Sequence, residues 1–247
     1  MSNSPNTPHY RYFDTIMVFF AVILVTSNVA SSAKIVDLGI SIFGFWVIPP
    51  IHLAFDGGTL LFPIAYVLGD VITEVYGFRA ARRVIWTGFF ALSLAALFFF
   101  VLYLLPADAV WEGYAGSAAF NAILGGMSTG GIVIASLSAY LVGEFANAAI
   151  LSRLKVLMKG RALWLRAIGS SLVGELLDSF IFVFIASLTG VFIWELFATL
   201  VLTNYLFKVS IEVIIFPLTF FVVQKLKKAE GLDTYDVNVK FNPFSLT

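Results

Sequence analysis

Cysteine is absent from the 247 residues, histidine occurs only twice, and charged residues make up only 12% of the chain. Without cysteine the chain forms no disulfide bond, no thiolate metal site and no thiol nucleophile. With His9 and His52 alone, a hard cation at carboxylates is the one metal that the composition allows. No stretch has the basic density of a nucleic-acid-binding surface, and no Walker motif is present. We therefore expect no cofactor, no bound metal and no nucleic-acid partner.

The hydrophobic content, in contrast, is high: 60% of residues, with a mean hydropathy of +0.95. Because soluble domains carry about 25% charged residues, the composition indicates an all-α integral membrane protein. Runs of about 20 apolar residues mark membrane helices. The second of the six expected spans is the least hydrophobic. The spans are predicted at 14–36, 60–77, 84–105, 128–152, 165–190 and 196–224. They form one membrane domain over residues 1–228, followed by a polar tail over 229–247.

The connection between the first two spans, residues 34–58, is rich in glycine, proline and β-branched residues. Pro49 and Pro50 exclude a continuous helix there. The segment is therefore predicted to form a β-hairpin or a re-entrant cap rather than a seventh span.

The positive charges alternate from one connection to the next along the chain. The connection after residue 105 carries only Asp108 and Glu112, and the one after residue 190 carries only Glu195. By the positive-inside rule, the basic connections are cytoplasmic. Both termini are then cytoplasmic, and the protein is expected in the cytoplasmic (inner) membrane. The basic residues are Arg79, Arg82, Arg83, Arg153, Lys155, Lys159, Arg161, Arg166, Lys225, Lys227 and Lys228.

Seven ionisable side chains lie inside the apolar spans, six of them acidic. Each would cost roughly 3 kcal/mol at the centre of a membrane helix if it faced lipid. Helical spacing places them on polar stripes, so we expect them to converge in the interior of the bundle. Tyr66, Asn28, Asn147 and Asn204 lie on the same stripes. The seven are Asp70, Glu74, Glu144, Glu175, Asp178, Lys208 and Glu212.

Structural explanations compete for some of these residues. Lys208 and Glu212 are spaced i, i+4 and are able to form an ion pair within one helix. Asp70 and Glu74 lie near the basic end of their span, where they are able to reach the cytoplasm or pair with Arg82. The asparagine side chains are able to form hydrogen bonds between helices. Glu175 and Asp178 have no base within a turn, so they must pair across the bundle, be protonated or bind a ligand.

Several segments together resemble the queuosine precursor transporter family, also called the vitamin uptake transporter family. They are FPIAYVLGDVITEVYG at 62–77, GEFAN at 143–147, RAIGSSLVGELLDSFIFVFIA at 166–186, NYLFKVSIEVIIFP at 204–217 and FNPF at 241–244. Segment 34–58 is longer than is usual in that family. The resemblance implies uptake of 7-deazaguanine precursors of queuosine: preQ0, preQ1 or queuine. It leaves open which of these is carried.

The chemistry of a guanine-like ring agrees with an acidic interior. Its N1–H and 2-amino group are two parallel donors, which a buried carboxylate accepts in bidentate fashion. We predict Glu175 and Asp178 for this edge, supported by Asn204 and Asn28, with Asp70, Glu74 and Tyr66 next. Lys208, Glu212 and Glu144 are predicted as coupling groups or counter-charges.

Uptake would proceed by facilitated diffusion or be coupled to a cation. Two other functions stay open. One is a solute-binding membrane subunit that needs a separate energising partner. The other is an intramembrane hydrolase, which the sequence favours least because no nucleophile–base pair accompanies the acids. The expected partners are a nucleobase-like small molecule and the lipid bilayer, with a homo-oligomer left open.

Overall fold

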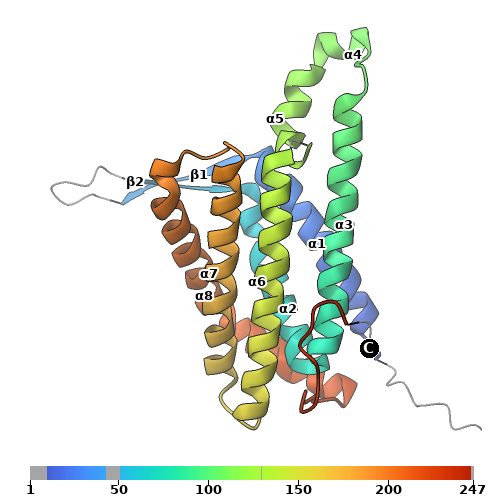
Figure 1. Cartoon of the computed structure of the whole chain (residues 1–247), viewed down its shortest axis with the longest axis vertical. Helices are drawn as coiled ribbons and strands as arrows, with labels where there is room; N and C mark the ends of the chain where they lie inside the picture. Colours follow the sequence, from blue (N-terminus) through green and yellow to red (C-terminus); the bar gives the residue numbers. More distant parts are fainter. Residues whose placement is uncertain (1–9, 43–50, 129, 246–247) are drawn as a thin grey trace, which may run out of the picture.

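The apolar runs become long helices, because in lipid every backbone N–H and C=O must be bonded within its own segment. The computed structural model describes residues 10–42, 51–128 and 130–245, and Figure 1 shows the bundle they form. The longer helices are α1 (Phe13–Ala33), α2 (Phe62–Tyr76), α3 (Phe78–Leu104), α6 (Gly130–Leu157), α7 (Leu163–Leu188) and α8 (Phe197–Glu230). The shorter elements are α4 (Ala109–Tyr114), α5 (Gly116–Ser128) and the 3-10 turns η1 (Gly57–Leu60) and η2 (Trp194–Leu196).

Five helical stretches among the described residues are long and apolar enough to cross a membrane. They are Phe13–Ser31, Phe78–Leu104, Gly116–Leu157, Leu163–Leu188 and Leu200–Glu230. α2 is not one of them, since its 15 residues rise only about 22 Å, against a hydrocarbon core of about 30 Å. The second half of α2 is buried inside the bundle. A sixth crossing over 60–77 therefore stays a prediction.

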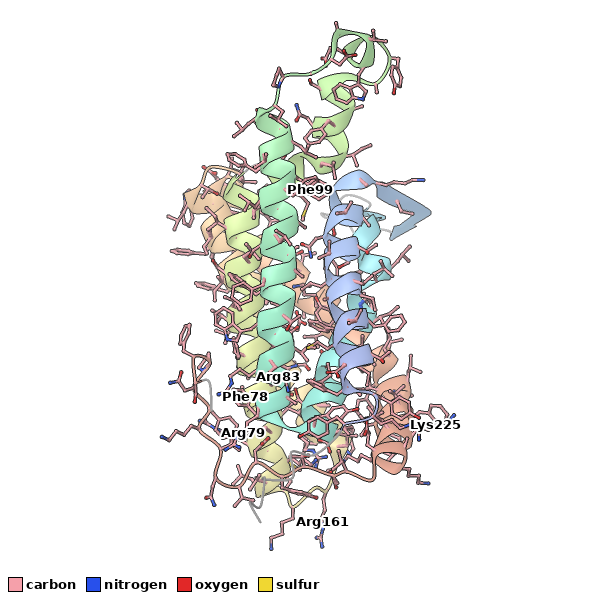
Figure 2. All side chains as sticks on the ribbon, turned by 90° about the vertical axis from the view of Figure 1, so that its right-hand side faces the viewer. Phe78, Arg79, Arg83, Phe99, Arg161 and Lys225 are labelled. Carbon is pink, nitrogen blue, oxygen red and sulfur yellow. The ribbon has the colours of Figure 1, made fainter. Side chains whose placement is uncertain are left out.

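The start of α1, the end of α2 and the end of α8 lie at the same end of the bundle. The backbone amides of Arg11 and Tyr12 donate to the Glu230 carboxylate at 2.9 and 2.7 Å. The Tyr76 hydroxyl donates to the same carboxylate at 2.7 Å. Figure 2 shows the basic residues Arg79, Arg83, Arg161 and Lys225 at this end, which we call the basic end. The first and last described residues thus share one end, opposite α4 and α5 (Figure 1).

Two boundaries differ from the sequence-based expectation. α3 begins at Phe78, directly after Gly77, whose φ of +84° permits a sharp turn. The arginines at 79, 82 and 83 therefore lie within a helix and not in a connection. The segment after residue 105, predicted as a loop, contains α4 and α5. Asp108 caps α4, because its side chain accepts hydrogen bonds from the backbone amides of Val110 and Trp111. A search for runs of 20 apolar residues misses a helix of six residues.

The segment between α1 and α2 contains two antiparallel strands, β1 (Ile35–Ile42) and β2 (Ile51–Asp56). Ile35 lies opposite Asp56, and Ile42 lies opposite Ile51. The pair lies at the end of the bundle opposite the basic end (Figure 1). The predicted turn or cap at 43–50, with both prolines, lies outside the described residues.

α6 and α7 pack closely at a pair of glycines. A Cβ atom added at Gly174 would lie 2.8 Å from Asn147 Cβ and 3.1 Å from the Gly143 carbonyl oxygen. One added at Gly143 would lie 2.8 Å from Asp178 Cβ. Small residues let two membrane helices approach at backbone distance. This approach brings the polar stripe of α6 next to that of α7.

We expect Gly174→Ala to destabilise the protein by about 1–3 kcal/mol, because the new methyl group forces α6 and α7 apart. The matched control is Gly169→Ala on the same helix, where the added Cβ would lie 3.9 Å from Leu154 Cδ1, an ordinary contact. Alanine favours a helix over glycine by up to about 1 kcal/mol, so this control should be neutral or stabilising. Thermal unfolding of the purified variants in detergent measures both effects. Equal midpoints for the two variants would contradict the close crossing.

Candidate functional site

A cavity of about 370 Å³ lies among the helices, on the side of the bundle interior away from the basic end. Its volume falls within the range of small-molecule sites, about 300–1,000 Å³. Four carboxyl groups and one ammonium group line it, together with amides, hydroxyls and aromatic rings. The polar and aromatic lining residues are Phe20, Asn28, Ser31, Phe62, Tyr66, Ser136, Tyr140, Glu144, Asn147, Ser171, Glu175, Asp178, Ser179, Phe182, Asn204, Lys208 and Glu212. Apolar residues of α1, α3, α5 and α6 complete the wall.

The ammonium group of Lys208 joins α8 to α7 at the wall of the cavity. Its Nζ donates a hydrogen bond to Asp178 Oδ2 and lies 3.5 Å from Glu175 Oε2. Among the described residues Lys208 thus pairs across helices, and not with Glu212 one turn along α8. Glu175 and Asp178 find their base across the bundle, which is one of the three outcomes expected for them.

Glu175 nevertheless keeps an acceptor without a hydrogen bond. Its side chain is only 8% exposed, and Oε2 has no hydrogen-bond partner in the described part of the chain. Two other atoms of the wall, Asn147 Oδ1 and Ser179 Oγ, likewise have no hydrogen-bond partner among the described residues. Buried polar atoms in native proteins almost always have partners. These three atoms indicate a site that is completed by a ligand or by water.

Asp70 and Glu212 lie on facing stripes of α2 and α8. The Asn147 amide nitrogen donates to Asp70 Oδ1 at 3.0 Å, and the Ser171 hydroxyl donates to Glu212 Oε1. Glu212 lines the cavity, whereas Asp70 lies behind the lining and reaches it through Asn147. Asp70 is 4% exposed, and it contacts the site through the Asn147 amide and through the Glu212 side chain.

The structure also brings the predicted Asn28, Tyr66 and Asn204 to the cavity wall. Asn28 is engaged locally, because its amide nitrogen donates to the Leu24 carbonyl oxygen at 2.8 Å. Its Oδ1 accepts from the Ser136 hydroxyl at 3.4 Å. Asn28 therefore ties α1 to α6 while lining the cavity.

Glu74 is not brought to the cavity. Its Oε1 lies 2.7 Å from Arg166 Nη2, 2.6 Å from Lys227 Nζ and 3.4 Å from Lys155 Nζ. Glu74, Lys155 and Arg166 are all at most 2% exposed. The structure thus places Glu74 in an ion cluster at the basic end, and it does not share a site with Glu175.

The C-terminal tail contributes a second acidic residue, Asp233, to this ion cluster. Asp233 Oδ1 lies 2.5 Å from Lys155 Nζ and 2.8 Å from Lys227 Nζ. Burial alone would raise the pKa of Asp233, but the hydrogen bonds from the two lysines outweigh it and hold the pKa below its ordinary value. The carboxylate therefore stays ionised at neutral pH. Further along the tail, Asp236 Oδ2 accepts a hydrogen bond from the backbone amide of Phe78 at 2.8 Å.

In the residues that the structure describes, no group of three or more histidine or acidic side chains is arranged to hold a metal ion. The cavity wall also contains Tyr140, Asn147 and Ser171, which helical spacing places on the polar stripes but which were not among the predicted binding residues. Asn147 lies three residues after Glu144 and Ser171 four before Glu175, so their helical spacing was a usable signal.

Comparison with known proteins agrees with the resemblance noted in the sequence. Residues 56–222 match the family described as "putative vitamin uptake transporter". The chain is 27% identical to the queuosine precursor transporter of Escherichia coli (strain K12), over 94% of this chain and 95% of that protein. It is 29% identical to a "probable queuosine precursor transporter" of Haemophilus influenzae, over 72% of each chain. A Bacillus subtilis (strain 168) protein of the same description is 27% identical over 66% of this chain and 69% of its own length. No solved structure matches the chain.

Proposed function

Because this multi-pass membrane protein belongs to the vitamin uptake transporter family, we propose that it carries queuosine precursors across the cytoplasmic membrane. The names of its relatives supply the substrate class. Family membership also favours a transporter over an enzyme. The observation that extends the proposal to particular residues is the acidic cavity with Glu175 in its wall, because among the described residues Glu175 Oε2 has no hydrogen-bond partner.

The substrate ring would be recognised at Glu175. A carboxylate that accepts N1–H and the 2-amino group makes two charge-assisted hydrogen bonds, which are about twice as strong as neutral ones. Asp178 is neutralised by Lys208 in this structure, so Glu175 is the better placed of the two for the base edge. Tyr66 and Phe182 supply aromatic faces in the same wall for stacking on the ring.

The basic end would face the cytoplasm by the positive-inside rule. With α2 as a short sixth crossing, both ends of the chain lie on that side. The lining residues of α6 run from Ile132 to Asn147 and stop before Lys155, where the Glu74 cluster begins. In this state the cavity would be separated from the cytoplasm by that cluster. Entry from the opposite side and release at the basic end would then require the cluster to rearrange.

Transport would be facilitated diffusion or would be coupled to a cation, with Lys208 exchanging partners between states. Its two acidic partners on α7 provide the alternatives that such an exchange needs. A single mobile counter-charge would keep the acids compensated when the substrate leaves.

The test is restoration of queuosine in tRNA. Bacteria that lack preQ0 synthesis and their own precursor transporter would express this chain alone and receive preQ0, preQ1 or queuine. We expect queuosine to reappear with at least one of them, and not with an empty vector. Absence of queuosine with all three, at normal membrane abundance, would refute the proposal. Rescue by the chain alone would also show that no separate energising partner is needed.

A further inference from the structure

We propose that Glu144 binds a positively charged substituent of the substrate, so that the site selects a 7-deazaguanine with an aminomethyl group over one with a neutral nitrile. The inference rests on the proposed function and deepens it, because it assigns a substrate subclass and a specificity-determining residue.

The charges around the cavity are unbalanced, with four carboxyl groups and one ammonium group in the lining. Lys208 contacts Glu175 and Asp178, and Ser171 donates to Glu212. In the described part of the chain, Glu144 is the cavity carboxyl group that is left without a hydrogen bond or an ion pair. A carboxylate in a membrane interior is costly without a counter-charge. A cationic ligand would supply that counter-charge on binding.

The backbone of α2 leaves space for the Glu144 carboxylate. A Cβ atom added at Gly69 of α2 would lie 3.2 Å from Glu144 Oε2, so the bare backbone at 69 leaves room for this carboxylate. The charged groups that influence it are the carboxyls of Glu175, Asp70 and Asp178 and the Lys208 ammonium. Three acids against one base make the surroundings of Glu144 favourable for an added cation.

The shape of the ligand separates its substituent from the edge that Glu175 would bind. The substituent is attached to the five-membered ring, away from the N1 and 2-amino edge. A ring held by Glu175 on α7 therefore directs its substituent away from α7. Glu144 lines the same cavity from α6 and, unlike Glu212 on α8, has no hydrogen-bond partner among the described residues. An alkylamine, like the lysine side chain, is protonated at neutral pH, whereas a nitrile is neutral. Glu144 is thus placed to distinguish the two.

A different role for Glu144 would be to carry a proton that drives transport. That role predicts another pattern, since loss of the coupling group affects every substrate alike. The two roles are separated by comparing a cationic and a neutral substrate in the same variant.

The experiment measures uptake of preQ1 and preQ0 by cells expressing the wild-type chain, Glu144→Gln or Glu144→Asp. For Glu144→Gln we expect preQ1 uptake to fall about 10- to 100-fold, the range for loss of one charge-assisted contact, while preQ0 uptake changes less than about threefold. Glu144→Asp keeps the charge and should retain the preference for preQ1. Glu195→Gln, the same change at an exposed site, should leave both rates unchanged.

Two further measurements are made on each variant. The abundance of the protein in the membrane shows whether Glu144→Gln folds, and the rise in melting temperature of the purified protein on adding preQ1 or preQ0 shows whether binding of preQ1 alone has weakened. An equal loss of both substrates would overturn the inference in favour of a coupling role, and unchanged rates for both would overturn it outright. If the wild-type chain carried queuine but neither preQ0 nor preQ1, the inference would fail while the proposed function stood. Uptake of none of the three would overturn both.

Discussion

Uptake of queuosine precursors is expected to fall at least about 100-fold when Glu175 is replaced by glutamine. The glutamine side chain presents one acceptor and one donor where the base edge needs two acceptors, so one contact is lost and one donor faces another donor. Breaking one buried, hydrogen-bonded charge pair costs about 2–5 kcal/mol, and each 1.4 kcal/mol is tenfold. Queuosine in tRNA, or uptake of labelled precursor, measures the effect.

The control for Glu175→Gln is Glu195→Gln, which removes one negative charge at an exposed position of η2. It should transport like the wild type. Asp178→Asn is expected to reduce uptake as well, but for another reason: it removes the carboxylate that holds Lys208. If Glu175→Gln is present in the membrane at normal level and transports normally, then Glu175 does not bind the substrate.

Replacing Glu74 with glutamine is expected to have the largest effect on stability. It removes the negative charge that Lys155, Arg166 and Lys227 share. Among the described residues, Arg166 then has no acidic partner, and Lys155 and Lys227 share Asp233 alone. Removing one partner of a buried ion pair costs about 3–5 kcal/mol, which corresponds to a drop of roughly 10 °C in the melting midpoint for a domain of this size. Thermal unfolding in detergent measures it.

Asp14→Asn is the matched control, because Asp14 is an exposed acid in the first turn of α1. A second variant, Glu74→Gln with Lys155→Gln, removes one of the two lysines that would otherwise share Asp233 alone. It should recover part of the lost stability. A midpoint for Glu74→Gln within about 2 °C of the Asp14→Asn control would show that the cluster does not stabilise the fold.

Asp70 and Glu74 lie on the same face of α2, but the sequence did not predict that they would have different surroundings. Their spacing of four residues places them on one face of a helix, and that face does point into the bundle. One turn also separates them by about 6 Å along the axis. That distance takes Glu74 out of reach of the cavity and into contact with the basic residues of α6, α7 and α8. Helical periodicity gives direction around a helix, whereas depth along the bundle depends on how the helices are packed.

Lys208 illustrates the same limit in its choice of partner. The sequence offered Glu212 at i+4 or an acid on another helix, and local spacing favoured neither. The packing of α7 against α8 places Asp178 and Glu175 next to the ammonium group, so Glu144 has no ion pair among the described residues. That arrangement, on which the specificity proposal rests, could not be read from any single segment.

The sequence by itself determined that this is a helical membrane protein with an acidic interior. Composition, apolar runs and the cost of charge in lipid are properties of residues and of local spacing, and the motifs that reveal the family are local too. The tertiary structure decided which acids share a cavity, which acid joins an ion cluster at the basic end, and which cavity carboxylate has no ion pair in the described part of the chain. Those outcomes depend on contacts between helices far apart in the chain, such as the approach of α6 and α7 at Gly143 and Gly174.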